Sequence, residues 1–280
     1  MIEAIFKYSF LQNAFLASIF AGVICGIIGV IIVEKKLLMM SGGIAHTAYG
    51  GVGLGYLLGF EPMLGAGIFS VTAAVTIGAI RRKNTRNSDV IIAVLWSLGM
   101  ALGIIFTEMM PGYPPDMNSY LFGNILSVTK ADLDTIIVLT IIVSAVIWIF
   151  YNDFKAFLFD EKFAAISGLN TALLEYLLLI MTALSVVALI RIAGIILVIV
   201  LLSAPAACAS FICKTLRGRM LTAIILSTLF SFAGITVSFY SGLPAGAVTV
   251  VISAAIYLLL ACFKAVFKKK YGKNHKRLYH

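Results

Sequence analysis

One imidazole lies inside an otherwise uncharged part of this chain. His46 falls within residues 37–60, which contain no lysine, arginine, aspartate or glutamate. On a helix its neighbours three and four residues away would be Gly42, Gly43, Tyr49 and Gly50, and this otherwise small face could approach another helix or line a path. A neutral imidazole can ligate a transition metal through one ring nitrogen, or it can form a hydrogen bond to a neighbouring helix. The residues alone leave both interpretations of His46 open.

Other residues that could do chemistry have simpler interpretations. Glu108 precedes a proline-rich stretch, residues 109–116, which could shape an entrance or dock an external protein but is more simply a solvated turn. Glu175 and Arg191 flank a hydrophobic segment, where long side chains can extend to the membrane interface. Thioethers are soft metal ligands that more commonly fill space in an apolar bundle. The methionines concerned are Met39, Met40 and Met100.

Residues 152–170 combine phenylalanines with mixed charge. Phe154, Phe157 and Leu158 have helical i, i+3, i+4 spacing, and Phe163 begins a second apolar set. Short amphipathic helices of this kind either lie on lipid or dock into the groove of a partner protein. The composition of the segment does not separate these two roles.

The elements that position these residues are expected to be membrane-spanning helices. Of 280 residues, 61% are hydrophobic and 12% are charged, and the mean hydropathy is +1.07. This composition excludes soluble enzymes, nucleic-acid-binding domains and disordered proteins. The longest uncharged run divides at a turn signal, Ser241-Gly242-Leu243-Pro244, so we predict an all-α, polytopic transmembrane bundle of eight to nine helices. The uncharged runs are residues 8–33, 37–60, 62–80, 90–107, 135–152, 176–190, 192–213 and 220–263.

Basic residues set the expected orientation of the bundle. Lysine and arginine concentrate in two short loops, 81–86 and 214–219, and in residues 264–280, so all three should face the cytoplasm. Alternation of the helices then places 152–170 inside as well and the N-terminus outside. The formal net charge is +9, but anionic lipid beside the basic tail explains it more simply than nucleic acid.

Two further patterns bear on packing and on catalysis. Gly51, Gly55 and Gly59 recur every fourth residue, a spacing that lets helices approach closely, and we expect all three to pack helices. The sequence contains no phosphate-binding loop of the G-x-x-x-x-G-K-[ST] type and no H-E-x-x-H zinc motif. The chain is therefore not expected to be an enzyme or to hydrolyse ATP by that route.

Four stretches in order carry a likeness to a known family. Each alone is weak, but together they extend over almost the whole chain, with weaker similarity at 88–89, 120–124 and 243–246. The four are FLQNAFLA at 10–17, IAHT leading to GVGLG at 44–55, FDEKFA with a following glycine at 159–168, and GIILV leading to APAA at 194–207. On these stretches the chain resembles the membrane permeases of ATP-binding-cassette importers for zinc, manganese and iron.

The resemblance implies a transmembrane permease domain over residues 1–263 and a basic cytoplasmic tail over 264–280, in the plasma or inner membrane of a cell. Its partners would be a second copy of the chain, two cytoplasmic ATP-binding subunits and an extracellular or periplasmic metal-binding protein. The divalent metal would be cargo, with no permanently bound cofactor, and ATP would bind to the partner subunits. A cytoplasmic coupling region within 152–170 would meet those subunits. Its matching residues are Phe159, Asp160, Glu161, Phe163, Ala164 and Gly168.

One position departs from the family pattern. Many members have an aspartate four residues before the histidine, and this chain has Gly42 there. The resemblance implies a place for His46 on the metal path, with imidazoles from two copies and water or other oxygens completing the ligand shell. Two alternatives stay open: a permease for a metal chelate or other small cargo, with a structural His46, and a secondary transporter that works without an ATPase.

Overall fold

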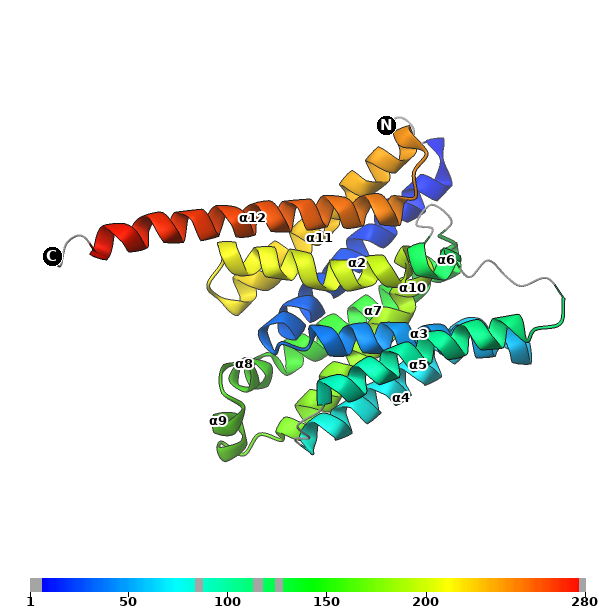
Figure 1. Ribbon diagram of the computed structural model, residues 1–280, viewed down its shortest axis with the longest axis horizontal. Coiled ribbons are helices and arrows are strands. Elements are labelled where there is room, and N and C mark those ends of the chain that lie inside the picture. Colours follow the sequence, from blue (N-terminus) through cyan, green and yellow to red (C-terminus); the bar gives the residue numbers. More distant parts are fainter. Residues whose placement is uncertain (1–6, 84–87, 113–117, 124–127, 277–280) are drawn as a thin grey trace.

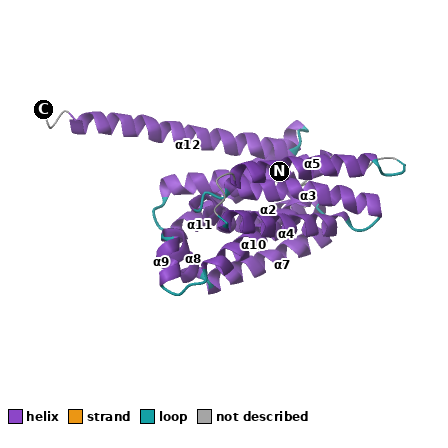
Figure 2. Ribbon diagram, turned by 60° about the horizontal axis from the view of Figure 1, so that its bottom comes forward, coloured by secondary structure: helices purple, strands orange, loops and turns teal. Residues whose placement is uncertain are grey.

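The computed structural model describes residues 7–83, 88–112, 118–123 and 128–276, and all regular structure in these ranges is helical. Figures 1 and 2 show long helices lying side by side, with short helices at the bundle ends. The long helices are α2 (Ser9–Glu34), α3 (Leu38–Leu58), α4 (Pro62–Arg82), α5 (Ser88–Glu108), α7 (Lys130–Ile149), α10 (Thr171–Ile212), α11 (Leu216–Ser241) and α12 (Ala245–Lys276). The short helices are α6 (Asn118–Phe122), α8 (Tyr151–Phe159) and α9 (Glu161–Ile166).

Among the described residues, eight helical stretches are long and apolar enough to cross a membrane. Helix α10 supplies two of them, Thr171–Ile190 and Ile192–Ile212, and the other long helices except α3 supply one each. Helix α3 has 21 residues, as α4 does, but it is rich in glycine, carries His46 and is not one of these eight stretches. The prediction of an all-α polytopic bundle of eight to nine helices is confirmed, and the chain is a multi-pass membrane protein.

Helix α3 packs between α4 and α5 with backbone nearly touching backbone. A Cβ atom added at Gly51 would overlap the backbone of Gly65 in α4, and one added at Gly53 would lie 2.5 Å from the carbonyl oxygen of Gly103 in α5. Real Cβ atoms do not come this close to backbone atoms, so only glycine permits this spacing. Small residues therefore hold α3 at a fixed position in its three-helix group.

Two of the three glycines expected to pack helices lie at such contacts. A Cβ at Gly55 would lie 2.6 Å from the Cα of Pro62, where α4 begins, and Gly51 meets Gly65. Gly59 has a different place, because it ends α3 as the C-cap with φ of 71°, and a Cβ there would meet nothing within 4 Å. At Gly59 the backbone conformation, rather than helix packing, favours glycine.

Helix α10 breaks at Gly194, whose φ of 76° and ψ of 158° are not helical. The break lies against the end of α6 and the start of α12, where a Cβ atom added at Gly123, Gly194 or Gly246 would overlap the backbone of a neighbouring element. We call these three residues the glycine junction. Three separate stretches that carried the family resemblance thus meet at one point, near the labels α6 and α10 in Figure 1.

The end of the bundle opposite the glycine junction gathers the basic loops. Arg81 of α4, Arg219 of α11 and Lys35 after α2 all form ion pairs there, close to α8 and α9 at the left of Figure 1. This grouping is what the positive-inside pattern requires, and the cytoplasmic placement of this end stays a prediction. The boundary at 264 also stays a prediction, and α12 continues through it to Lys276.

Candidate functional site

His46 lies half-buried on α3 with two contacts to α5. Its Nδ1 atom is 2.9 Å from the sulfur of Met100, and its ring stacks on Trp96 with centroids 4.3 Å apart and planes 18° from parallel. Trp96 and Met100 are four residues apart, so they lie on one face of α5 directly opposite the imidazole. The structure therefore brings together one of the three methionines considered as soft ligands and the one histidine of the predicted path.

Close approach of the two backbones makes these contacts possible. A Cβ at Gly99 would lie 2.5 Å from the Cα of Thr47, and one at Gly50 would lie 2.7 Å from the carbonyl oxygen of Gly99. Gly99 thus lies between Trp96 and Met100 in the sequence and against the residue that follows His46. Because the small residues bring the backbones of α3 and α5 into contact, they hold Trp96 and Met100 against the ring.

The position of the missing family aspartate is filled from the neighbouring helix. A Cβ at Gly42 would lie 3.4 Å from the ring of Trp96, which is ordinary contact rather than overlap. Within the described residues, no group of three or more histidine, cysteine, aspartate and glutamate side chains could hold a metal ion. One chain thus offers an imidazole and a thioether at this place, and a full ligand shell would need water or a second chain.

The other candidate methionines and carboxylates lie elsewhere. Met39 is exposed and Met40 is buried in the core. Glu108 is exposed at the end of α5, and residues 113–116 of the proline-rich stretch lie outside the described residues, as does the side chain of Arg191. Of the described side chains among them, those of Met39, Met40 and Glu108 are not among the contacts of His46.

Glu175 was expected to extend to the membrane interface, and this prediction is wrong. The residue is only 3% exposed and its carboxylate pairs with Arg81 at 3.2 Å and Arg82 at 3.3 Å. Burying an unpaired carboxylate costs free energy because the charge loses its hydration. The two arginines of α4 replace that hydration with ion pairs. This cluster fixes the start of α10 to the end of α4.

The predicted coupling region forms α8 and α9, and its six matching residues have distinct structural places. Phe159 is 91% exposed and Phe163 is also exposed, whereas Ala164 is fully buried. Asp160 caps α9 by accepting hydrogen bonds from the backbone N–H groups of Lys162 and Phe163. Gly168 follows α9 with a φ of 86°. The sixth residue, Glu161, forms the ion pair described next.

Lys35 connects this region to the corner between α2 and α3. Its Nζ atom lies 2.8 Å from Glu161 of α9 and 3.4 Å from the ring centroid of Phe157 in α8, and Phe157 itself is buried. Next to it, Glu34 pairs with Arg219 of α11. Sequence reasoning missed these pairs because they join residues far apart in the chain, 126 residues in the case of Lys35 and Glu161.

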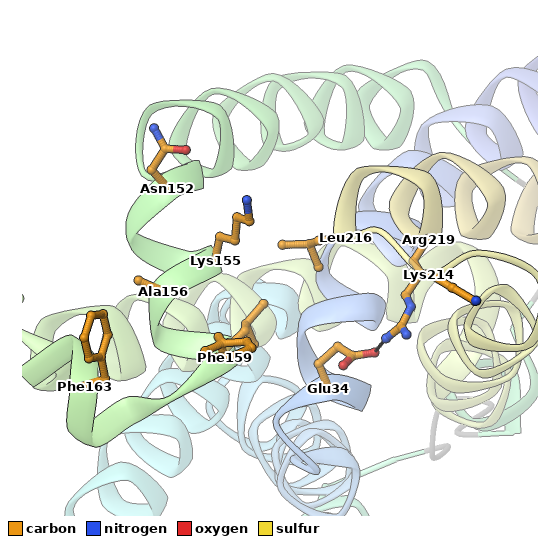
Figure 3. Close-up of a pocket in the computed structure, with 10 residues that line it drawn as sticks. Glu34, Asn152, Lys155, Ala156, Phe159, Phe163, Lys214, Leu216 and Arg219 are labelled. Carbon is orange, nitrogen blue, oxygen red and sulfur yellow. Dashed lines mark hydrogen bonds and ion pairs between the residues drawn. The ribbon is translucent and has the colours of Figure 1, made fainter.

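A groove of about 690 Å³ runs between α8–α9 and the loop before α11. Figure 3 shows Phe159 and Lys155 on one side and Leu216 with the Glu34–Arg219 pair on the other. The groove thus combines exposed aromatic surface with lysine side chains, which suits an apolar segment that carries acidic residues. Its lining residues are Glu34, Asn152, Lys155, Ala156, Leu158, Phe159, Phe163, Lys214, Leu216 and Arg219.

Known proteins match nearly the whole chain. A membrane protein of Synechocystis, itself uncharacterised, is 38% identical over 264 residues, 94% of each chain. The manganese transport system membrane protein MntC of Listeria monocytogenes is 31% identical over 262 residues, 94% of this chain and 93% of the relative. The structure of PsaBC from Streptococcus pneumoniae in complex with Fab contains a chain with a TM-score of 0.84 and 28% identity, covering 92% of this chain and 93% of that one.

The family assignment covers both the site and the coupling region. Residues 7–264 match the ABC 3 transport family, a range that includes His46, the glycine junction and α8–α9. The resemblance drawn from the ordered motifs is thereby confirmed. From the matched range and the relatives together, this chain belongs to the ABC 3 transport family.

Proposed function

We propose that this chain is the membrane-spanning permease subunit of an ATP-binding-cassette importer for a divalent transition-metal ion, with manganese as the first candidate. The observation that carries the proposal is the family match over residues 7–264 in a chain whose bundle holds a half-buried imidazole. Manganese comes first because the MntC relative is named for its transport. The chain forms the path across the membrane, and ATP is hydrolysed by a partner.

His46 is the residue proposed to meet the metal along the path. An imidazole nitrogen binds Mn²⁺, Fe²⁺, Co²⁺ and Zn²⁺, and its neutral form adds no charge to the membrane interior. A dimer of this chain would bring two such rings, with water completing the shell. Few ligands make a weak site, and a weak site suits an ion that must leave again.

The α8–α9 region is proposed to receive the ATP-binding subunit. Phe159, Phe163 and Ile166 expose large apolar side chains at the end of the bundle where the basic loops gather, which supports a protein partner in place of water. Movement of α9 would reach α3 through the Lys35–Glu161 pair, because Lys35 lies in the corner that precedes α3. ATP-driven closure of the partner subunits would then shift the bundle between its outward-open and inward-open states.

Transport in proteoliposomes tests the proposal directly. The chain would be reconstituted with its ATP-binding subunit and delivery protein, and accumulation of manganese, zinc, iron and cobalt would be measured with and without ATP. ATP-dependent accumulation of manganese is the expected result. A working ATPase without accumulation of any free ion would favour the metal-chelate alternative, and accumulation without an ATPase would favour a secondary transporter.

A further inference from the structure

The contact between Met100 and His46 favours one tautomer of the imidazole ring. A thioether sulfur has no hydrogen and can only accept a hydrogen bond. The Nδ1 atom, 2.9 Å from that sulfur, must therefore be the donor. A neutral imidazole protonated at Nδ1 has its lone pair on Nε2, and within the described part of the chain no hydrogen bond engages Nε2. Nε2 is thus the nitrogen available to a metal ion.

The neutral form of the ring follows from its surroundings. An imidazolium inside a membrane bundle needs a carboxylate nearby, and the helical neighbour that could supply one is Gly42. Among the described residues, the side chains in contact with His46 are a thioether and an indole ring, neither of which carries a charge. The ring is therefore held as a neutral ligand.

Trp96 and Met100 restrict the ring in complementary ways. The stack on Trp96, with planes 18° apart, fixes the tilt of the imidazole. The hydrogen bond to Met100 fixes its rotation within that plane, because flipping the ring would move Nδ1 away from the sulfur. Both residues come from one face of α5, which the glycine contacts hold against α3. The direction of the Nε2 lone pair is thereby set before any ion arrives.

We propose that Met100 is a positioning residue that keeps His46 in the Nδ1–H tautomer and leaves Nε2 as the metal-binding atom of the path. This inference rests on the proposed function. Metal-bound histidines generally donate their other N–H group to a carboxylate or a carbonyl, which raises the basicity of the bound nitrogen. A thioether is a weaker acceptor, so Nε2 here orients an ion without holding it tightly. The class of ion is a divalent transition metal, since Mg²⁺ and Ca²⁺ prefer oxygen ligands.

Nitrogen NMR of the full chain in its complex with the ATP-binding subunit tests this assignment. The chain has three histidines, and His275→Gln with His280→Gln would leave His46 as its only one; the partner subunit would be unlabelled. The expected spectrum shows a protonated Nδ1 and an unprotonated Nε2. In Met100→Leu, which keeps the volume but removes the acceptor, Nε2–H should appear, and Mn²⁺ should bind about tenfold more weakly. Met181→Leu, a buried methionine in α10, is the matched control and should change neither.

Each outcome decides a separate question. A protonated Nε2 in the wild-type chain, or the same tautomer in Met100→Leu, would overturn the proposal. If Met100→Leu does not fold, the wild-type tautomer still decides, because the proposal requires a bare Nε2. Addition of Zn²⁺ should shift the Nε2 resonance selectively. A bare Nε2 that does not respond to Zn²⁺ or Mn²⁺ would leave the positioning role intact and refute the place of His46 on the metal path.

Discussion

The interior around His46 and the end that carries α8 and α9 are held together by opposite means. In the interior, α3 meets α4 and α5 through glycines whose backbones touch, so the fit depends on the absence of side chains at these positions. At the α8–α9 end, Lys35, Glu161 and Phe157 hold the elements through charge and an aromatic face. The interior should therefore be sensitive to added volume, and the end should be sensitive to lost charge.

The largest expected effect follows from adding volume to the interior. Gly51→Val places side-chain atoms into the backbone of Gly65, so α3 and α4 must separate. Overpacking of this kind costs about 1–3 kcal/mol, and a displaced helix loses further contacts. We expect little monodisperse protein and a lowered thermal midpoint in detergent. Gly67→Ala in the same helix as Gly65 is the control, because its Cβ meets nothing within 4 Å; equal damage from both changes would contradict the packing argument.

The second effect follows from removing the imidazole of His46 from the interior without adding volume. His46→Ala should reduce ATP-dependent metal uptake to background while assembly with the ATP-binding subunit stays intact, since the ring is only half-buried. Uptake and co-purification would be measured on the same preparation. His275→Ala, a histidine of the tail, should leave uptake unchanged. Normal uptake by His46→Ala would remove this residue from the path.

The third effect tests charge at the α8–α9 end. Lys35→Met keeps most of the aliphatic stem against Phe157 but loses the ion pair with Glu161. Because the Glu161 side chain is partly exposed, the pair contributes about 1 kcal/mol. We expect fewer ions to be transported per ATP hydrolysed, because movement of α9 would no longer be passed to Lys35 through this pair. Lys36→Met, the exposed neighbour, should not change this ratio, and an equal fall in both would argue against a specific link.

The smallest expected effect places a carboxylate beside the ring of Trp96, where an added Cβ atom would make ordinary contact. Gly42 faces the ring of Trp96 at ordinary contact distance, so Gly42→Asp should fold, with its carboxylate one helical turn from His46. An added oxygen ligand suits Mn²⁺, and the affinity for this ion should rise about tenfold. Gly42→Asn has the same shape without the charge and is the control. Equilibrium binding that is identical for both variants would show that the carboxylate does not reach the ion.

The helices could be predicted from the sequence because a membrane demands long uncharged runs. The runs proved helical, although two of them lie in α10 and the longest is divided between α11 and α12. The spacing of small residues also identified α3 as a closely packed helix. It could not distinguish Gly51, which touches another backbone, from Gly59, which ends the helix, because both conditions select glycine. Local pattern thus predicts that glycine is needed but not the reason.

Contacts between distant segments could not be predicted. Met100 reaches His46 from 54 residues away, and Arg81 and Arg82 bury Glu175 from more than 90 residues away. No periodicity within one helix encodes such pairs, because they depend on how helices are placed beside one another. The sequence therefore indicated His46 as a candidate and left its partners unknown until α5 was placed.

The glycine junction has a consequence for how this chain can change over generations. Gly123, Gly194 and Gly246 come from the end of α6, the break in α10 and the start of α12, and a Cβ atom added at any of them would overlap the backbone of a neighbouring element. An isolated substitution at any of the three therefore meets main-chain atoms, and no side-chain change in the neighbouring element could make room for it. We therefore expect related chains to keep glycine at these three positions together.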